Sequence, residues 1–142
     1  AETPFDMAIC VFTVLLYLLD KKSLTKAIKS VGDALISGGY LLIDIPSKAI
    51  FQSYQSSTSI IDRIVTVSAT NENEIYQYIE ETSLKTEGQV KAYTDKFKIK
   101  YWDVEQVMAV LVENGFSVER DYTSEFSGAG SYYFLMKKNS PT

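Results

Sequence analysis

Two polar segments of this chain follow apolar runs that have the composition of strands. Thr13 comes after the run Phe5–Phe12, and Asp44 lies at the carboxyl end of the run Tyr40–Ile45. Ligands of open α/β sheets bind outside the carboxyl ends of the strands, so we expect both segments to face the same crevice. Asp44 has two possible roles there, because it can contact a ligand or cap the polar stretch 47–59.

The residues that are absent exclude several kinds of chemistry. The chain has no histidine and a single cysteine, Cys10. Ser-His-Asp catalysis, Cys-His catalysis and imidazole metal sites are therefore excluded for this polypeptide acting alone. Cys10 lies inside an apolar run, so we expect a buried apolar side chain rather than a nucleophile. No metal site is expected.

Charge and hydropathy argue against nucleic acid and membrane partners. The net charge of −4 over 142 residues gives no attractive field for phosphates, and the alternating Lys96, Lys98 and Lys100 predict a solvated strand face. The apolar stretch Val11–Leu19 is too short to span a bilayer and ends at Asp20. We expect a soluble, cytoplasmic protein with no nucleic acid and no membrane partner.

The first third of the chain predicts a strand, a helix and a second strand. The run Phe5–Phe12 is typical of a strand covered on both faces, as in the middle of a parallel sheet. Apolar residues at helical spacing predict a helix over Leu24–Ile36, which we expect the glycine pair Gly38-Gly39 to end. A second buried strand is predicted over Tyr40–Ile45, closed by Pro46. This order is typical of one half of a doubly wound sheet.

The middle of the chain predicts an antiparallel meander inserted into this α/β pattern. Its strands are expected at Ile60–Ser68, Ile75–Ser83 and Lys91–Tyr101, with short turns between them. Short connections require antiparallel neighbours. The alternation in the third strand predicts one covered face and one solvated face.

The last third returns to the α/β pattern. Asp103 and Gln106 have the spacing of a capping box, followed by a predicted apolar helix stripe. The stripe consists of Val104, Val107, Met108, Leu111 and Val112. Gly115 is expected to end this helix, and the strands Val118–Phe126 and Ser131–Lys138 are expected to form a hairpin.

Several passages, in this order and spacing, resemble the C-terminal half of class I S-adenosylmethionine-dependent methyltransferases. They are Phe5-Asp6, Leu15–Leu18, Leu35–Asp44 and Gly115-Phe116, of which the third is similar to the family passage Leu-x-x-Gly-Gly-x-x-x-x-Asp. The resemblance implies an α/β fold: a partial doubly wound, Rossmann-like sheet with a three-stranded antiparallel insertion and a C-terminal antiparallel hairpin. It implies a single domain over residues 1–142, with the meander inserted at 60–101.

The same resemblance implies where S-adenosylmethionine would bind. Phe12, Thr13 and Val14 match the family segment whose backbone lies against the cofactor, and Tyr17 lies near the site in many such enzymes. The family's glycine-rich loop and ribose-binding acid have no counterpart here. We therefore expect the cofactor to bind only in the intact parent, and this chain alone to be inactive. The catalytic residues are unknown.

The resemblance further implies a small-molecule methyl acceptor, which the insertion helps to cover. Asp44, Tyr78, Tyr101 and Trp102 are the candidate substrate-binding residues. The alternative is that the aromatic residues of the insertion serve packing, since aromatic pairs across strands stabilise sheets directly.

Two further expectations concern assembly and the extent of the protein. The first strand, Phe5–Phe12, would form a long apolar edge, and such edges recruit other strands. This predicts a homodimer or higher oligomer through that strand. Ala1–Pro4 contains no initiator methionine, which favours a truncated product. The alternative function is a non-catalytic α+β binding or oligomerisation module.

Overall fold

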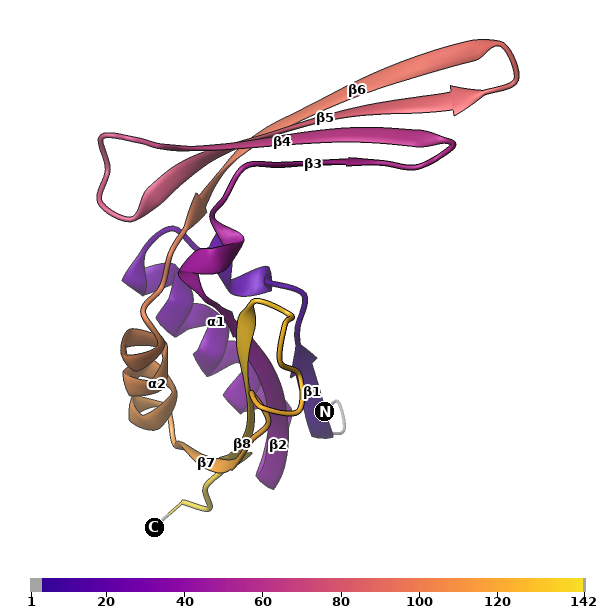
Figure 1. Ribbon diagram of the computed structural model, residues 1–142. Coiled ribbons are helices and arrows are strands. Elements are labelled where there is room, and N and C mark those ends of the chain that lie inside the picture. The colour runs from indigo at the N-terminus through magenta and orange to yellow at the C-terminus, as the bar shows by residue number, and fades with distance from the viewer. Residues whose placement is uncertain (1–3, 142) are drawn as a thin grey trace. The chain divides into compact units, whose positions relative to one another are not determined.

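The computed structural model describes residues 4–141, so most of the Ala1–Pro4 segment considered above lies outside the described residues (Figure 1). The chain divides into two compact units, one formed by residues 1–50 with 102–142 and the other by residues 51–101. Each unit is built around its own four-stranded sheet.

The first unit contains a mixed sheet in the order β1-β2-β8-β7. Its strands are β1 (Phe5–Cys10), β2 (Leu35–Pro46), β7 (Phe116–Asp121) and β8 (Ser131–Lys138). β1 runs parallel to β2, and β8 is antiparallel to both β2 and β7. The expected α/β fold class with a C-terminal antiparallel hairpin is confirmed.

Two helices, α1 (Lys21–Ala34) and α2 (Val104–Glu113), pack on the sheet of this unit (Figure 1). Each begins at an aspartate: Asp20 accepts the Ser23 N–H at 2.7 Å, and Asp103 forms the predicted capping box with Gln106. Their apolar faces share one buried cluster with the sheet. It includes Leu24 and Ile28 of α1, Leu41, Ile43 and Ile45 of β2, Val107, Val110 and Leu111 of α2, and Met136 of β8.

The helix stripe predicted for α2 needs one correction. Val110 is buried beside Val107 and Leu111, whereas Val112 is exposed. Residues three and four positions apart share a helix face, so Val107, Val110 and Leu111 form the buried stripe. Val112 lies one further residue around the helix, on the solvated side.

The glycine pair Gly38-Gly39 does not end the first helix, as the sequence suggested. α1 ends at Ala34, and the glycines lie inside β2, where the pairing with β1 jumps from Phe5↔Leu35 to Met7↔Tyr40. Gly38 has φ +79°, and a Cβ on Gly39 would lie 3.1 Å from the Asp6 carbonyl oxygen. The pair therefore permits an irregularity in β2 and a close approach to β1.

β1 is not covered on both faces, which corrects a second expectation. Ala8 and Cys10 pack against the core, whereas Phe5 and Ile9 are 63% and 64% exposed. Both helices pack on the face that bears Leu41 and Ile43, and β1 is an edge strand of this sheet. Among residues 4–141 its second face and outer edge therefore have no covering element in this unit.

The second unit is an antiparallel meander in the order β3-β4-β5-β6. Its strands are β3 (Tyr54–Ser57), β4 (Ile61–Ala69), β5 (Ile75–Thr86) and β6 (Gln89–Lys100). The antiparallel insertion is confirmed, with a fourth strand, β3, that the sequence analysis missed because it is short and polar. Most of β6 is exposed on both faces, so only the end of the strand near Ile99 has the covered face that alternation predicted.

The remaining elements are two short 3-10 helices and a long loop. The helices are η1 (Val14–Tyr17) and η2 (Lys48–Ile50). β7 ends at Asp121, so the segment up to Phe126 is loop rather than the predicted strand; the Phe126 ring packs 4.8 Å from the Tyr133 ring. Within residues 4–141, no helix has the length and apolar character needed to cross a membrane.

The exposed row on β1 gives the first testable prediction. Ile9→Lys should shift the chain toward smaller species at micromolar concentration, because a charge on an apolar edge strand opposes pairing with another strand. Multi-angle light scattering measures the change. Val118→Lys is the matched control, since Val118 is an exposed apolar residue on β7, the other edge of the same sheet. Equal effects of the two variants would contradict association through β1.

Candidate functional site

The segment that leaves β1 is a turn with an unusual backbone. Phe12 and Thr13 are consecutive residues with φ +66° and +62°, and neither is glycine. Left-handed conformations are costly for side chains with a Cβ, most of all for β-branched ones such as threonine. Strained positions of this kind persist only where surrounding contacts hold them, and they concentrate at functional sites.

Asp44 is the contact that holds this turn. Its side chain is 1% exposed, and the Thr13 N–H lies 3.2 and 3.1 Å from its two carboxylate oxygens. The carboxyl ends of β1 and β2 therefore meet, as the sequence analysis predicted. Asp44 does not cap the stretch 47–59; the Ala49 N–H there is bound by the Ser47 hydroxyl. Its burial favours a positioning role over direct contact with a substrate.

Burial raises the pKa of Asp44 above the ordinary value for aspartate, and the Thr13 N–H and the Ser131 hydroxyl lower it in part. Ser131 begins β8, and its Oγ is buried without a hydrogen bond of normal geometry. Burial and the nearby Asp44 charge also raise the pKa of Cys10. The thiol therefore stays protonated at neutral pH, which supports its interpretation as an apolar side chain.

The residues that follow the turn present their side chains to solvent. Phe12 is 87% exposed, and Val14 and Tyr17 are also exposed, whereas Leu15 and Leu16 are buried and anchor η1. The exposure of Val14 argues against a core role for it. Phe12, Val14 and Tyr17 thus form a solvent-accessible row beside the half-buried Thr13.

Trp102 lies in the core of the first unit. It is 5% exposed, and its indole N–H donates a 2.8 Å hydrogen bond to the Leu18 carbonyl. This bond fixes the chain directly after Tyr17. Trp102 thus has the packing contacts of a core residue, and its assignment to a substrate site stays a prediction.

Tyr78 and Tyr101 belong to the second unit. The Tyr78 ring stacks on Phe97 at 4.6 Å, and its hydroxyl donates to Glu80 at 3.0 Å. Burial, followed by that hydrogen bond, raises the pKa of Tyr78. Tyr101 packs edge-on against Phe51 with the ring centres 5.8 Å apart. Both tyrosines have the packing contacts that the sequence analysis weighed as the alternative.

A shallow depression beside Asp44 was missed by the sequence analysis. The start of η2 joins the loop before β8, because the Ser47 N–H and hydroxyl both bind the Gly130 carbonyl, at 3.0 and 2.9 Å. Hydroxyl side chains line the depression there: Ser47, Thr123, Ser124, Ser127 and Ser131. The only sequence signal was the Ser- and Gly-rich stretch 127–131. The described part of the chain contains no cluster of three His, Cys, Asp or Glu residues that could hold a metal ion.

Comparison with known proteins gives one consistent result. No protein-family model and no curated protein matches the chain. Its structure is similar to that of an S-adenosylmethionine-dependent methyltransferase from Clostridium acetobutylicum, with a TM-score of 0.84 and 14% identity over 99% of this chain and 61% of the other. The chain has the fold of part of that methyltransferase.

Two further solved structures support this result. One is the amino pentose methyltransferase CalS10 from Micromonospora echinaspora, with a TM-score of 0.74 and 14% identity over 98% of this chain and 60% of the other. The other is the sugar N-methyltransferase KedS8 from Streptoalloteichus, with a TM-score of 0.75 and 16% identity over 96% and 57%. The chain thus spans about 60% of the length of these methyltransferases, as expected for a C-terminal half. Identities this low establish the fold alone.

The raised pKa of Asp44 gives a prediction about stability. A carboxyl group whose pKa is higher in the folded state than in the unfolded state binds more protons when folded, so stability falls as the pH rises through that interval. The contribution of Asp44 to the free energy of unfolding should therefore fall as the pH rises from about 3.9, the ordinary pKa of aspartate, toward the raised value.

The test compares the wild type with Asp44→Asn by urea denaturation across this pH range. The amide of the variant still offers an oxygen to the Thr13 N–H but does not ionise. As the pH rises through this range, the free energy of unfolding of the wild type should fall relative to that of Asp44→Asn. A pH-independent difference would contradict a raised pKa for Asp44.

Proposed function

We propose that this chain is the C-terminal part of an S-adenosylmethionine-dependent methyltransferase that acts on a small molecule. One observation carries the proposal. A chain with the fold of such enzymes has a strained, solvent-accessible turn at the carboxyl end of β1, held by a buried carboxylate. The carboxyl ends of parallel strands are where such sheets bind their ligands.

The open side of the first unit supports the idea of a partial fold. The apolar residues Phe5 and Ile9 are exposed, and the outer edge of β1 is unpaired within residues 4–141. Parallel strands in α/β proteins normally have both faces covered. A larger sheet with a further helical layer would cover these surfaces, which agrees with the share of the compared enzymes that the chain spans.

The row after β1 is the proposed contact surface for the cofactor. Phe12, Val14 and Tyr17 offer exposed side chains, and Thr13 offers a hydroxyl. S-adenosylmethionine, when bound, would supply an electrophilic methyl carbon, which the nucleophile of the acceptor attacks in line while the carbon–sulfur bond breaks and the thioether leaves. Such a reaction depends mainly on positioning, so the lack of histidine is no obstacle. Asp44 and Trp102 act as positioning residues, since each binds the backbone on one side of this row.

The small-molecule acceptor is part of the proposal. The two compared enzymes with stated substrates are an amino pentose methyltransferase and a sugar N-methyltransferase. The hydroxyl-lined depression around Ser47 and Ser131 lies next to Asp44, which interacts with the Ser131 hydroxyl. Its hydroxyl groups can donate and accept hydrogen bonds, which suits a polar methyl acceptor such as a sugar.

The direct test uses the longest natural polypeptide that contains these residues. Calorimetric titration with S-adenosylmethionine should show binding, and transfer of a radiolabelled methyl group to small amines and alcohols should follow. The 142-residue chain alone should bind the cofactor weakly or not at all. Failure of the longer protein to bind would favour a non-catalytic binding or oligomerisation module.

Another prediction concerns which residues contact the cofactor. In that longer protein, Thr13→Val and Tyr17→Phe should each weaken S-adenosylmethionine binding by about threefold to tenfold, the usual effect of losing one hydrogen bond. Tyr78→Phe, the matched control in the second unit, should leave the affinity unchanged. The three dissociation constants can be compared by calorimetry. Equal effects at all three positions would remove the basis for this assignment.

A further inference from the structure

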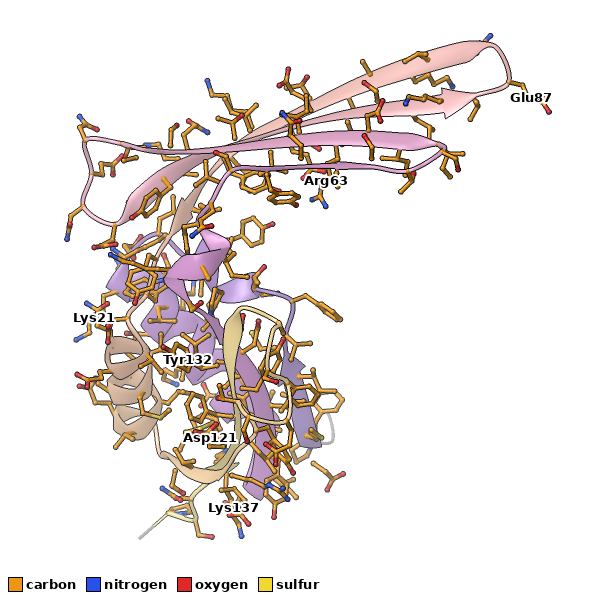
Figure 2. The ribbon with its side chains drawn as sticks, viewed as in Figure 1. Lys21, Arg63, Glu87, Asp121, Tyr132 and Lys137 are labelled. Atoms are coloured by element: carbon orange, nitrogen blue, oxygen red, sulfur yellow. The ribbon has the colours of Figure 1, made fainter. Side chains whose placement is uncertain are left out.

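The solvent-facing side of α1 carries a cluster of basic side chains. Four exposed lysines, here called the lysine face of α1, line a shallow hollow together with Thr25: Lys21, Lys22, Lys26 and Lys29. Lys21 extends from the first turn of the helix into solvent (Figure 2). The other side of α1 is buried, because Leu24 and Ile28 belong to the core of this unit. The lysine face is therefore a surface that the packing of the first unit leaves open.

The lysines of the first turn oppose the helix dipole. Lys21 and Lys22 directly follow the cap Asp20, and the first turn contains no acidic side chain. The N-terminus of a helix carries a partial positive charge, so cations are unfavourable there. The helix α2 of the same unit has the usual arrangement, since Glu105 lies in its first turn. The first turn of α1 thus departs from a rule that α2 follows.

The lysines also repel one another along the helix. Lys22 and Lys26 are four positions apart and Lys26 and Lys29 three positions apart, and like charges at these spacings destabilise a helix. Within residues 4–141, Lys29 is the one member of the face with a salt bridge, which joins its Nζ to the Asp33 carboxylate at 2.7 Å. Lys22 lies near Asp20 without forming one. Most of the positive charge is therefore uncompensated.

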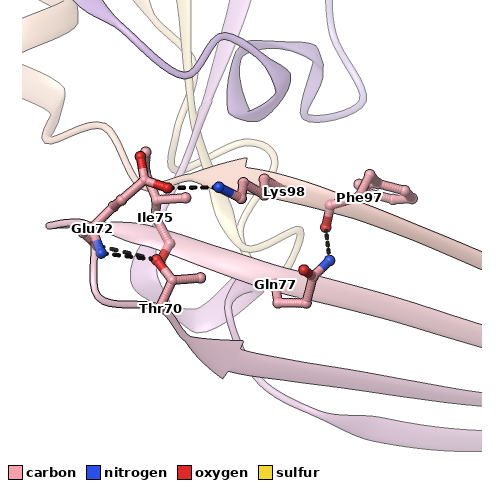
Figure 3. A network of polar contacts seen from close by, with 6 residues as sticks. All are labelled: Thr70, Glu72, Ile75, Gln77, Phe97 and Lys98. Atoms are coloured by element: carbon pink, nitrogen blue, oxygen red, sulfur yellow. Dashed lines mark hydrogen bonds and ion pairs between the residues drawn. The ribbon is translucent and has the colours of Figure 1, made fainter.

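The lysines of the insertion are arranged differently. Lys98 of β6 forms a 2.6 Å ion pair with Glu72 (Figure 3), and Lys85 of β5 is paired with Asp62. Acidic residues of neighbouring segments thus neutralise part of the charge there. Departures from local stability rules are expected at functional surfaces. The lysine face of α1 shows such a departure, which points to a partner outside this unit.

The dimensions of the lysine face suit an extended anion. Lys21 and Lys29 are about 12 Å apart along the helix axis, so one small anion would contact only part of the face. The sequence of α1 contains no arginine, whose planar fork binds phosphate through two parallel hydrogen bonds. Carboxylates that repeat once per helical turn, about every 5.4 Å, match the spacing of Lys22, Lys26 and Lys29. An acidic protein segment has this pattern.

Two other polyanions fit the lysine face less well. Helices that bind a membrane surface combine basic residues with an apolar face that enters the lipid, whereas Leu24 and Ile28 of α1 are buried in the core. Nucleic acid carries a dense negative charge, and the net charge of −4 of the whole chain opposes its approach. A short acidic segment carries few charges, so the rest of the chain repels it least.

We propose that the lysine face of α1 is a docking surface for an acidic segment of another protein, in which carboxylates repeat about once per helical turn. The contact rests on charge complementarity between the four ammonium groups and these carboxylates. Ion pairs between exposed side chains are weak and are screened by salt, so the complex is transient. The proposal does not depend on the methyltransferase function.

The test measures the binding of a synthetic peptide to the full 142-residue chain by fluorescence anisotropy. The probe is a labelled helical peptide whose glutamates repeat every three to four residues, and the same peptide with glutamine in their place is its control. The glutamate peptide should bind at about 50 mM salt and dissociate as the salt concentration rises, whereas the glutamine peptide should not bind.

Variants of the lysine face locate the binding site. Lys22→Glu and Lys26→Glu should each raise the dissociation constant of the peptide by at least about threefold, because each replaces an attraction by a repulsion. Lys22→Arg keeps the charge and should keep the affinity. Lys96→Glu is the matched control, since Lys96 is an exposed lysine of β6 that has no salt bridge within the described part of the chain. All three glutamate variants change the net charge equally.

Thermal melts followed by circular dichroism establish that the variants are folded. Lys22→Glu should melt no lower than the wild type, because a glutamate in the first turn of a helix is favourable. The proposal is supported if both α1 variants lose affinity and Lys96→Glu does not. Equal effects of the three variants would overturn it, as would failure of the wild type to bind the glutamate peptide. Tighter binding to phosphatidylserine–phosphatidylcholine vesicles or to polyuridylate than to the peptide would also overturn it.

Discussion

The buried Asp44 carboxylate is the interaction on which the candidate site depends. Burial of a charge is unfavourable unless partners compensate it, and the Thr13 N–H is the partner recruited here, from 31 positions away in the chain. The contact joins the carboxyl ends of β1 and β2 and maintains two successive left-handed residues. The strained turn is thereby held in place, and the side chains of Phe12, Val14 and Tyr17 are exposed to solvent beside it. Trp102 fixes the other end of this surface through the Leu18 carbonyl.

A second constraint is the one-sided packing of the first sheet. α1 and α2 bury Leu41 and Ile43, so the alternate residues of the same strands are left on the opposite face. In β1 this leaves Phe5 and Ile9 exposed. The same asymmetry explains why the apolar cluster of this unit lies on the face of the sheet that the two helices cover.

The insertion follows a different physical pattern. Its stability rests on pairs across the strands, such as the Tyr78–Phe97 stack and the Arg63–Glu80 ion pair, because no helix packs on it within its own unit. Short-range pairs can hold a meander together, and burial within the sheet is limited to a few residues such as Val65 and Ile99.

The sequence by itself determined the order of the main elements apart from β3, the capping box at Asp103, the antiparallel insertion and the convergence of Asp44 with the segment after Phe12. These follow from local periodicity, capping and strand direction. Only the tertiary structure decided that Gly38-Gly39 lies in an irregular strand, that Trp102 is a core residue, and that the Asp44 carboxylate binds the Thr13 N–H. These features depend on contacts between residues far apart in the chain, and local patterns carry no information about such contacts.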